Sequence, residues 1–205
     1  MDEARVQAYI ESANYAGLAT AASDFELDMS HADAAPELSA YVYKVHLLAH
    51  LLLNQLDEAR FLWKRLPATM RADAELAAIW AVGKQMWLRD HAAVQAAAGA
   101  RAAWAQHTVG AMVAELSARY LERAFCALGL AYVSISADAL ASKLGVPAQR
   151  VRELAATHGW TADAASGLYT PAKPAADASA PSGSRHVEEL QRLTNYVAHL
   201  DREVR

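Results

Sequence analysis

The sequence predicts a mainly α-helical protein: tetratricopeptide-like helical repeats, then a winged helix, then a detached C-terminal helix. Three observations predict this fold. Alanine dominates a hydrophobic fraction of 54%, and alanine favours helices over strands. Apolar residues recur at helical spacing through residues 1–131, as amphipathic helices require. Residues 132–171 then follow a strand, helix, turn, helix and hairpin order, and an amphipathic segment at 187–205 follows a stretch rich in Pro, Ala and Ser.

Composition excludes several classes of protein. A chain of 205 residues can build one large or two small domains with a sizeable core. The net charge of −4 gives no excess of Lys and Arg for nucleic acid or an anionic membrane. The acidic N-terminus lacks the apolar run of a secretory signal, and the most apolar stretch, 45–53, is too short to span a bilayer. We therefore expect a soluble intracellular protein.

The repeat region is predicted to form a stack of helices. Two modest helices are expected over 2–13 and 15–29, and Pro36 suits the first turn of a third helix that runs to Leu52. Further helices are expected over 56–66, 76–87, 91–98 and 108–131. The last of these is apolar on most sides, which predicts a central position. Gly83 should let a neighbouring helix approach closely.

A faint internal repeat runs through this region. Leu56-Asp57-Glu58-Ala59 is echoed by Arg89-Asp90-His91-Ala92-Ala93, which puts Asp57 and Asp90 33 residues apart. That period is typical of tetratricopeptide-like helix pairs, which stack to bury their faces. Each aspartate is expected to follow one helix and open the next. With two visible copies, the pattern indicates a helical stack more strongly than a regular array.

Residues 132–171 carry the start and stop signals of a winged helix. Ser136 can cap the first helix and Gly145 can end it in a left-handed conformation. Pro147 starts the second helix and Gly159 ends it. The segments 160–163 and 168–170 flank a turn that contains Gly167, as the two strands of a wing would.

A winged helix raises the alternative of DNA binding. The second helix offers Gln149, Arg150, Arg152 and Glu153, whereas the wing carries Asp163 and no Lys or Arg. Phosphate contacts supply most of the affinity for DNA, and this module has too few cations to make them. Protein docking is the favoured interpretation, and DNA binding stays the alternative.

The C-terminal part of the sequence predicts a flexible tether followed by an amphipathic helix that needs a surface to pack on. Residues 172–186 are too rich in Ala, Pro and Ser to build a core. An isolated helix of the length of 187–205 is marginal in water, so it needs a surface to pack on. It either folds back on its own winged helix or enters a bundle with helices of other chains. The expected partner contacts are Leu190, Leu193, Tyr196, Val197 and Leu200, with Trp160 and Tyr169 of the winged helix.

The sequence offers no catalytic site, metal site or cofactor site. His46 and His50 have the spacing of two zinc ligands on a helix, but Leu47 occupies the position of the general base and no third ligand is evident. We expect them to be core or partner-facing histidines, and Cys126 to be a small buried hydrophobe. Nucleophile-elbow, phosphate-loop, dinucleotide and isopeptidase patterns are missing. Three helix-borne tryptophans are expected to be core or interface anchors: Trp63, Trp80 and Trp87.

Several blocks together resemble a known family. They are Ala59-Arg60-Phe61-Leu62-Trp63-Lys64-Arg65-Leu66-Pro67, a W-x-x-G-x-x-x-W pattern within 78–87, Tyr132-Val133-Ser134-Ile135, Leu144-Gly145-Val146-Pro147, Gly159-Trp160-Thr161-Ala162-Asp163 and the terminal segment 190–200. In this order they resemble the smallest, eighth subunits of the COP-9 signalosome, over about residues 40–205. These subunits belong to the PCI-domain family, which also supplies subunits of the proteasome regulatory lid and of translation initiation factor three. Residues 1–35 carry no motif of the family.

The resemblance implies a non-catalytic scaffold subunit with a PCI domain. In that family, winged helices of several subunits associate side by side and C-terminal helices enter a common bundle. The complex removes the ubiquitin-like modifier Nedd8 from cullins, with its catalytic metal site in another subunit. The implied partners are other PCI subunits, with cullin–RING ubiquitin ligases as indirect partners and neither nucleic acid nor membrane, and the implied location is the cytoplasm and nucleus. A lid or initiation-factor subunit is the alternative.

Overall fold

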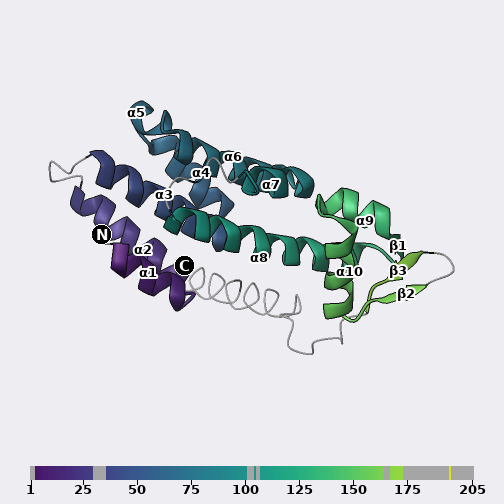
Figure 1. Cartoon of the computed structure of the whole chain (residues 1–205). Helices are drawn as coiled ribbons and strands as arrows, with labels where there is room; N and C mark the ends of the chain where they lie inside the picture. Colours follow the sequence, from purple (N-terminus) through teal and green to yellow (C-terminus); the bar gives the residue numbers. More distant parts are fainter. Residues whose placement is uncertain are drawn as a thin grey trace, which may run out of the picture. The chain divides into compact units, whose positions relative to one another are not determined.

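The structure is a computed structural model that describes residues 3–29, 36–100, 104, 107–163, 167–172 and 194. The chain divides into two units, Met1–Ala172 and Lys173–Arg205. The predicted tether beyond Ala172 and the predicted C-terminal helix other than Thr194 lie outside the described residues. Within the first unit the predicted fold class is confirmed: a stack of helices followed by a small winged-helix module (Figure 1). None of the described helices has the length and apolar character needed to cross a membrane.

The helical region follows the apolar periodicity of the sequence. Its helices are α1 Glu3–Glu11, α2 Tyr15–Met29, α3 Pro36–Leu52, α4 Leu56–Arg65, α5 Ala68–Arg71, α6 Ala74–Leu88, α7 His91–Ala98 and α8 His107–Ala131. From α1 to α8, each helix packs on the next one along the chain, except that α4 packs on α6 and not on the short α5; α3 also packs on α6 and α8. The short α5 was not predicted, because its four residues carry no apolar stripe and bury no side chain.

The central helix is α3 rather than α8. Between Val42 and Leu52 nearly every side chain of α3 is buried. In contrast, α8 buries one stripe, from Thr108 to Leu128, and exposes the opposite face. The prediction of a central α8 is wrong because alanines on its outer face raise its apolar content, while exposing so small a side chain costs little.

A buried ion pair joins α3 to the start of α6. The Lys44 Nζ lies 2.9 Å from Oε2 of Glu75 and 3.1 Å from Oδ2 of Asp73. Asp73 also caps α6 by accepting a hydrogen bond from the Leu76 N–H. Burial alone would lower the pKa of Lys44, but hydrogen bonds to Glu75 and Asp73 outweigh it and raise the pKa. The lysine is therefore held charged between two carboxylates.

The structure tests two of the sequence predictions: the equivalence of Asp57 and Asp90, and the close helix approach at Gly83. Asp90 is the cap of α7 and accepts from the Ala93 N–H, whereas Asp57 lies inside α4, whose cap position is Gln55. The two aspartates are therefore not equivalent, which weakens the 33-residue repeat. The close approach predicted at Gly83 is present, because a Cβ there would lie 3.0 Å from a methyl group of Leu51 on α3.

The winged-helix module contains β1 Ile135–Ser136, α9 Ala137–Leu144, α10 Ala148–Thr157, β2 Thr161–Asp163 and β3 Leu168–Thr170. The strands form an antiparallel sheet in the order β1-β3-β2, in which Tyr169 pairs with Ile135 on one side and Ala162 on the other. Ser136 caps α9, and Gly145 ends it in the left-handed conformation, as the sequence predicts. The β-branched alternation of 132–136 predicts the first strand; the observed strand is shorter and leaves out Tyr132, Val133 and Ser134.

Candidate assembly interface

The winged-helix module is joined to the end of α8 by an aromatic contact. The Trp160 ring lies 4.2 Å from the Phe125 ring between centroids, and Phe125 is fully buried. On the same side of α8, a Cβ on Gly129 would come within 2.7 Å of the Trp160 ring. The His158 ring also lies against Phe125, at 5.1 Å between centroids. The Trp160 ring thus packs over Gly129 and holds the winged-helix module against α8.

A second junction joins the module to α7. Gly145, at the end of α9, has φ of 68°, and a Cβ there would lie 2.5 Å from the Ala92 Cα. Backbone therefore meets backbone at this point, as only glycine allows. With two junctions, the module has a fixed position on the helical stack, and its free surfaces point in defined directions.

The two winged-helix residues predicted to bind a partner are engaged within the chain. Tyr169 is buried in the central strand, and Trp160 is half-buried against α8. Their partner contacts stay a prediction, as do those of the tail residues, which lie outside the described part of the chain: Leu190, Leu193, Tyr196, Val197 and Leu200.

The module exposes two other features that suit protein association. The strand β2 lies at the edge of the sheet, and all three of its side chains are exposed. Edge strands offer unpaired backbone groups to other chains. Close to the other edge strand, the end of α8 exposes Leu130, and the turn that follows it exposes Tyr132 and Val133, at 74%, 37% and 88%. We name these three residues the junction cluster.

Sequence reasoning missed the junction cluster. Val133 was expected to continue the β-branched alternation of the first strand, but the strand begins only at Ile135. Leu130 follows Leu128 by two residues on α8, so the two side chains face different directions. The helical periodicity could have shown that Leu130 falls off the buried stripe.

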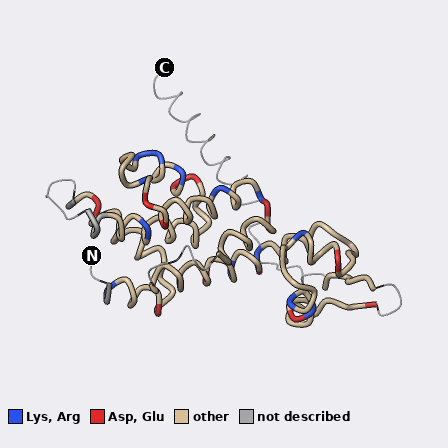
Figure 2. The backbone as a smooth tube through the Cα atoms, turned by 45° about the horizontal axis from the view of Figure 1, so that its top comes forward, with Lys and Arg blue, Asp and Glu red and all other residues tan. Residues whose placement is uncertain are grey.

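The charges of α10 argue for protein docking rather than DNA binding. Gln149, Arg150, Arg152 and Glu153 are all exposed. However, the Arg150 Nη1 lies 2.8 Å from Oε2 of Glu153, so one of the two cations is already paired. Basic and acidic residues are interspersed along the described chain (Figure 2). Among the described residues of α10, Arg152 is left without an ion pair, and one such cation is fewer than the several phosphate contacts that DNA binding uses.

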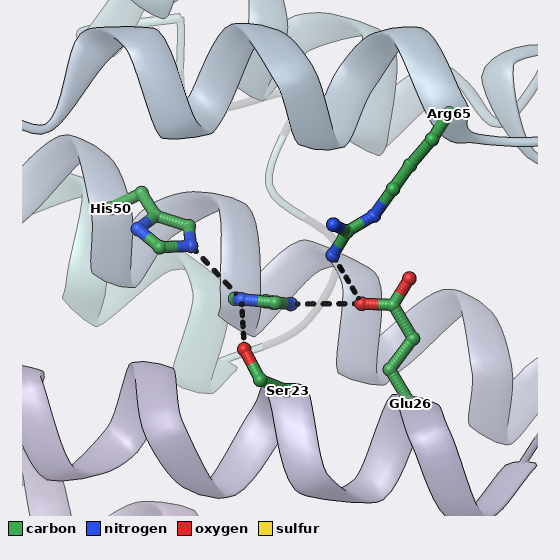
Figure 3. A network of polar contacts seen from close by, with 5 residues as sticks. Ser23, Glu26, His50 and Arg65 are labelled. Carbon is green, nitrogen blue, oxygen red and sulfur yellow. Dashed lines mark hydrogen bonds and ion pairs between the residues drawn. The ribbon is translucent and has the colours of Figure 1, made fainter.

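The histidine pair forms part of a polar network between α2, α3 and α4 (Figure 3). The Nε2 atoms of His46 and His50 lie 2.9 Å apart, and the Ser23 hydroxyl lies 3.2 Å from Nε2 of His46. On the other side of the His46 ring, Nδ1 lies 3.5 Å from Oε2 of Glu26, which also pairs with Arg65 at 2.6 Å. The prediction of core histidines is confirmed for His46, which is 1% exposed.

The contacts in this network hold the side chains in place, but the side chains are not arranged as a metal site. Within the described residues, no group of three His, Cys, Asp or Glu side chains is arranged to hold a metal ion. Burial would raise the pKa of Glu26, but hydrogen bonds from His46 and Arg65 outweigh it and lower the pKa. Burial lowers the pKa of His50 and outweighs its hydrogen bond to Gln55. The network therefore joins α2 to α4 through the Glu26–Arg65 pair and α2 to α3 through the buried His46.

The expectation of a buried cysteine is wrong. Cys126 is exposed on α8, although its neighbour Phe125 is fully buried. Consecutive helical residues point about 100° apart, so an apolar neighbour in the sequence does not place Cys126 in the core. Trp63 and Trp80, in contrast, stack between α4 and α6 with ring centroids 5.5 Å apart, as anchors of the helical stack.

Comparisons with known proteins match most of the chain. A profile of the CSN8/PSMD8/EIF3K family matches residues 37–179. The chain is 36% identical over 177 residues to a Xenopus laevis protein named COP9 signalosome complex subunit 8, covering 86% of this chain and 87% of the relative. Proteins with the same name from Danio rerio and Arabidopsis thaliana are also 36% identical, over 86% and 78% of this chain and 88% and 79% of those relatives. The profile match includes α4, α6 and the winged-helix module.

Proposed function

The chain belongs to the CSN8/PSMD8/EIF3K family, and from that premise we propose that it is a subunit of the COP9 signalosome. The observation that carries this proposal is the identity of 36% over 177 residues to a protein named COP9 signalosome complex subunit 8. The similarity extends to plants at the same identity. The match to relatives of this name favours the signalosome over the proteasome lid and translation initiation factor three.

Within the complex, the proposed role is that of a non-catalytic scaffold. The winged helix and the C-terminal helix would contact other PCI subunits, and the complex would remove Nedd8 from cullins with a catalytic subunit elsewhere. The exposed edge strand β2 and the junction cluster support this role, because both are features that another chain can cover. Cullin–RING ubiquitin ligases would be indirect partners. The proposed location, in the cytoplasm and nucleus, follows from this place in the complex.

Copurification tests the proposal. Tagged full-length protein is isolated from native lysate, and the proteins bound to it are identified by mass spectrometry. Recovery of signalosome subunits would support the proposal. Recovery of lid or initiation-factor subunits in their place would leave the family unchanged and overturn the function.

A tail variant tests the proposed part of the C-terminal helix. Replacing Leu193, Val197 and Leu200 by glutamate removes the apolar stripe without changing residues 1–172, so we expect loss of signalosome subunits from the purified protein. Replacing Glu188, Glu189 and Arg192 by glutamine is the matched control, because these residues are expected on the polar part of the helix. Equal recovery with both variants would show that the tail is not the attachment point.

A further inference from the structure

A groove between α4 and α6 has no role in the proposed assembly. It is a partly open cavity of about 290 Å³ lined by Arg60, Trp80, Lys84, Trp87 and Leu88. We name these five residues the α4–α6 groove. Its volume is near the lower end of ligand pockets, which measure about 300–1,000 Å³. A space of this size holds one or two side chains of a peptide.

The groove exists because α6 carries a second apolar face. The face toward the core contains Leu76, Ile79, Val82, Gly83 and Met86. The residues at 80, 84, 87 and 88 share another face at helical spacing. Trp63 of α4 covers Trp80 on this face, but Trp87 is 49% and Leu88 67% exposed. A helix that is apolar on both faces is normally buried on both. The outward face is therefore suited to a partner.

The groove is also positively charged. Arg60 lies on α4 and Lys84 on α6, both are exposed, and neither forms an ion pair with any described residue. Among the described residues, no acidic side chain lines the cavity. The whole chain carries a net charge of −4, so two unpaired cations beside the half-buried Trp80 and the exposed Trp87 are a local feature that the overall charge does not explain.

Arg60 is already positioned to bind a carboxylate. Its Cζ atom lies 5.5 Å from the centre of the Trp87 ring, a cation–π contact between α4 and α6. A guanidinium held over a ring keeps its in-plane N–H donors free for a bidentate pair with a carboxylate. The Trp63–Trp80 stack fixes the two helices behind this contact. The groove thus needs little rearrangement on binding.

We propose that the α4–α6 groove binds an acidic peptide segment of another protein, whose aromatic or aliphatic side chain enters the groove and whose carboxylates pair with Arg60 and Lys84. Charge complementarity selects this partner, because the lining of the groove combines two unpaired cations with apolar side chains. This binding is separate from the winged-helix contacts of the proposed function, and it needs no other subunit.

Fluorescence anisotropy of a labelled peptide on the purified full-length chain tests the proposal. The probe is a short peptide in which one tryptophan and one leucine are flanked by aspartates and glutamates. The reference peptide has the same apolar residues with asparagine and glutamine in place of the acids. We expect the acidic peptide to bind at least about ten-fold more tightly than the amide peptide, with an affinity that falls as salt rises.

Variants with matched controls locate the binding. The pair R60E/K84E should weaken binding by about ten-fold or more, whereas K64E/R71E, which changes the net charge equally at exposed cations outside the groove, should leave it unchanged. Likewise W87A should weaken binding, and F61A, which removes an aromatic ring that is 57% exposed outside the groove, should not. Urea unfolding of each variant confirms that it is folded.

Three results would overturn the proposal. The first is equal binding of the acidic and amide peptides, or no binding of either. The second is an equal loss of binding with the groove variants and their controls. The third is self-association of the wild-type chain in sedimentation equilibrium that W87A abolishes, because the occupant would then be a second copy of the chain. A failure to recover signalosome subunits on copurification would count against the proposed function. It would not change the result of the peptide-binding assay.

Discussion

Gly145 meets the backbone of Ala92 so closely that a Cβ on the glycine would lie 2.5 Å from the Ala92 Cα. The contact joins the end of α9 to α7, and thus the winged-helix module to the helical stack. The glycine also adopts a φ of 68°, which ends α9 in the left-handed conformation. Gly145 therefore meets two separate requirements: it adopts the left-handed conformation, and it leaves room for the backbone of Ala92.

We expect Gly145→Ala to destabilise the protein more than Gly159→Ala. Gly159 has nearly the same φ, 67°, but a Cβ there would meet no atom within 4 Å beyond its chain neighbours. Replacing Gly159 by alanine should cost only the strain of holding alanine in the left-handed conformation, roughly 1–2 kcal/mol. At Gly145 the clash with backbone should add roughly 1–3 kcal/mol. Urea unfolding of both variants checks this, and equal losses would show that the α7–α9 contact contributes nothing.

The ion pair of Lys44 with Glu75 should couple α3 to α6 energetically. Both side chains are buried, so Lys44→Met would leave Glu75 without its cation, at a cost of about 3–5 kcal/mol. Removing the second charge as well, in Lys44→Met/Glu75→Gln, should recover part of that loss. A double-mutant cycle by urea unfolding measures the coupling, which we expect at roughly 0.5–3 kcal/mol. Additive losses would contradict a direct interaction.

The histidine network should make stability fall on acidification. The pKa of His50 is lowered by burial, so the unfolded chain binds this proton more readily and stability is lost as the pH falls below about 6.5. The pKa of Glu26 is also lowered, and its contribution is lost at lower pH, below the ordinary range of a carboxyl group. The lowered pKa values of His50 and Glu26 both reduce stability as the pH falls. The unfolding free energy should therefore rise with pH from the acidic range to about 6.5.

The variant His50→Gln isolates the first of these effects. Its unfolding free energy should depend less on pH between pH 5 and 7, with the slope smaller than that of the wild type by up to about 1.4 kcal/mol per pH unit. His107→Gln is the matched control, because that histidine is exposed at the start of α8 and takes no part in the network. Parallel pH curves for wild type and His50→Gln would rule out the histidine as a source of acid sensitivity.

Local signals in the sequence predict most of the fold. The periodic stripes placed α6 and α8 within about two residues, and single residues with strong conformational preferences, Ser136 and Gly145, placed the start and the end of α9. The short α5 has no such signal. The exposure of Cys126 depends on where the buried stripe of α8 lies, which the composition around it does not show.

The functional surfaces are harder to predict, because they depend on which residues a fold leaves uncovered. Arg60 and Trp87 are 27 residues apart and meet only because α4 packs on α6. The contact between His46 and Glu26 likewise joins two helices. Trp160 shows the opposite case: its place in the wing suggested a partner contact, but its ring packs on Phe125 of the same chain. Periodicity within one helix gives no information about such pairings.

The junction cluster should be required for incorporation into the complex that we propose. Leu130 and Val133 are 74% and 88% exposed, so Leu130→Glu/Val133→Glu should change the stability of the free chain by no more than about 0.5 kcal/mol. In the assembly the same glutamates would be buried against a partner without a counter-charge, which is strongly unfavourable. We therefore expect the variant to fold and to lose signalosome subunits on copurification. Leu27→Glu is the control, because that leucine is 65% exposed on α2, away from the winged-helix module. Full recovery of the subunits with the double variant would show that the complex does not cover this cluster, and the edge strand β2 would then be the surface to test.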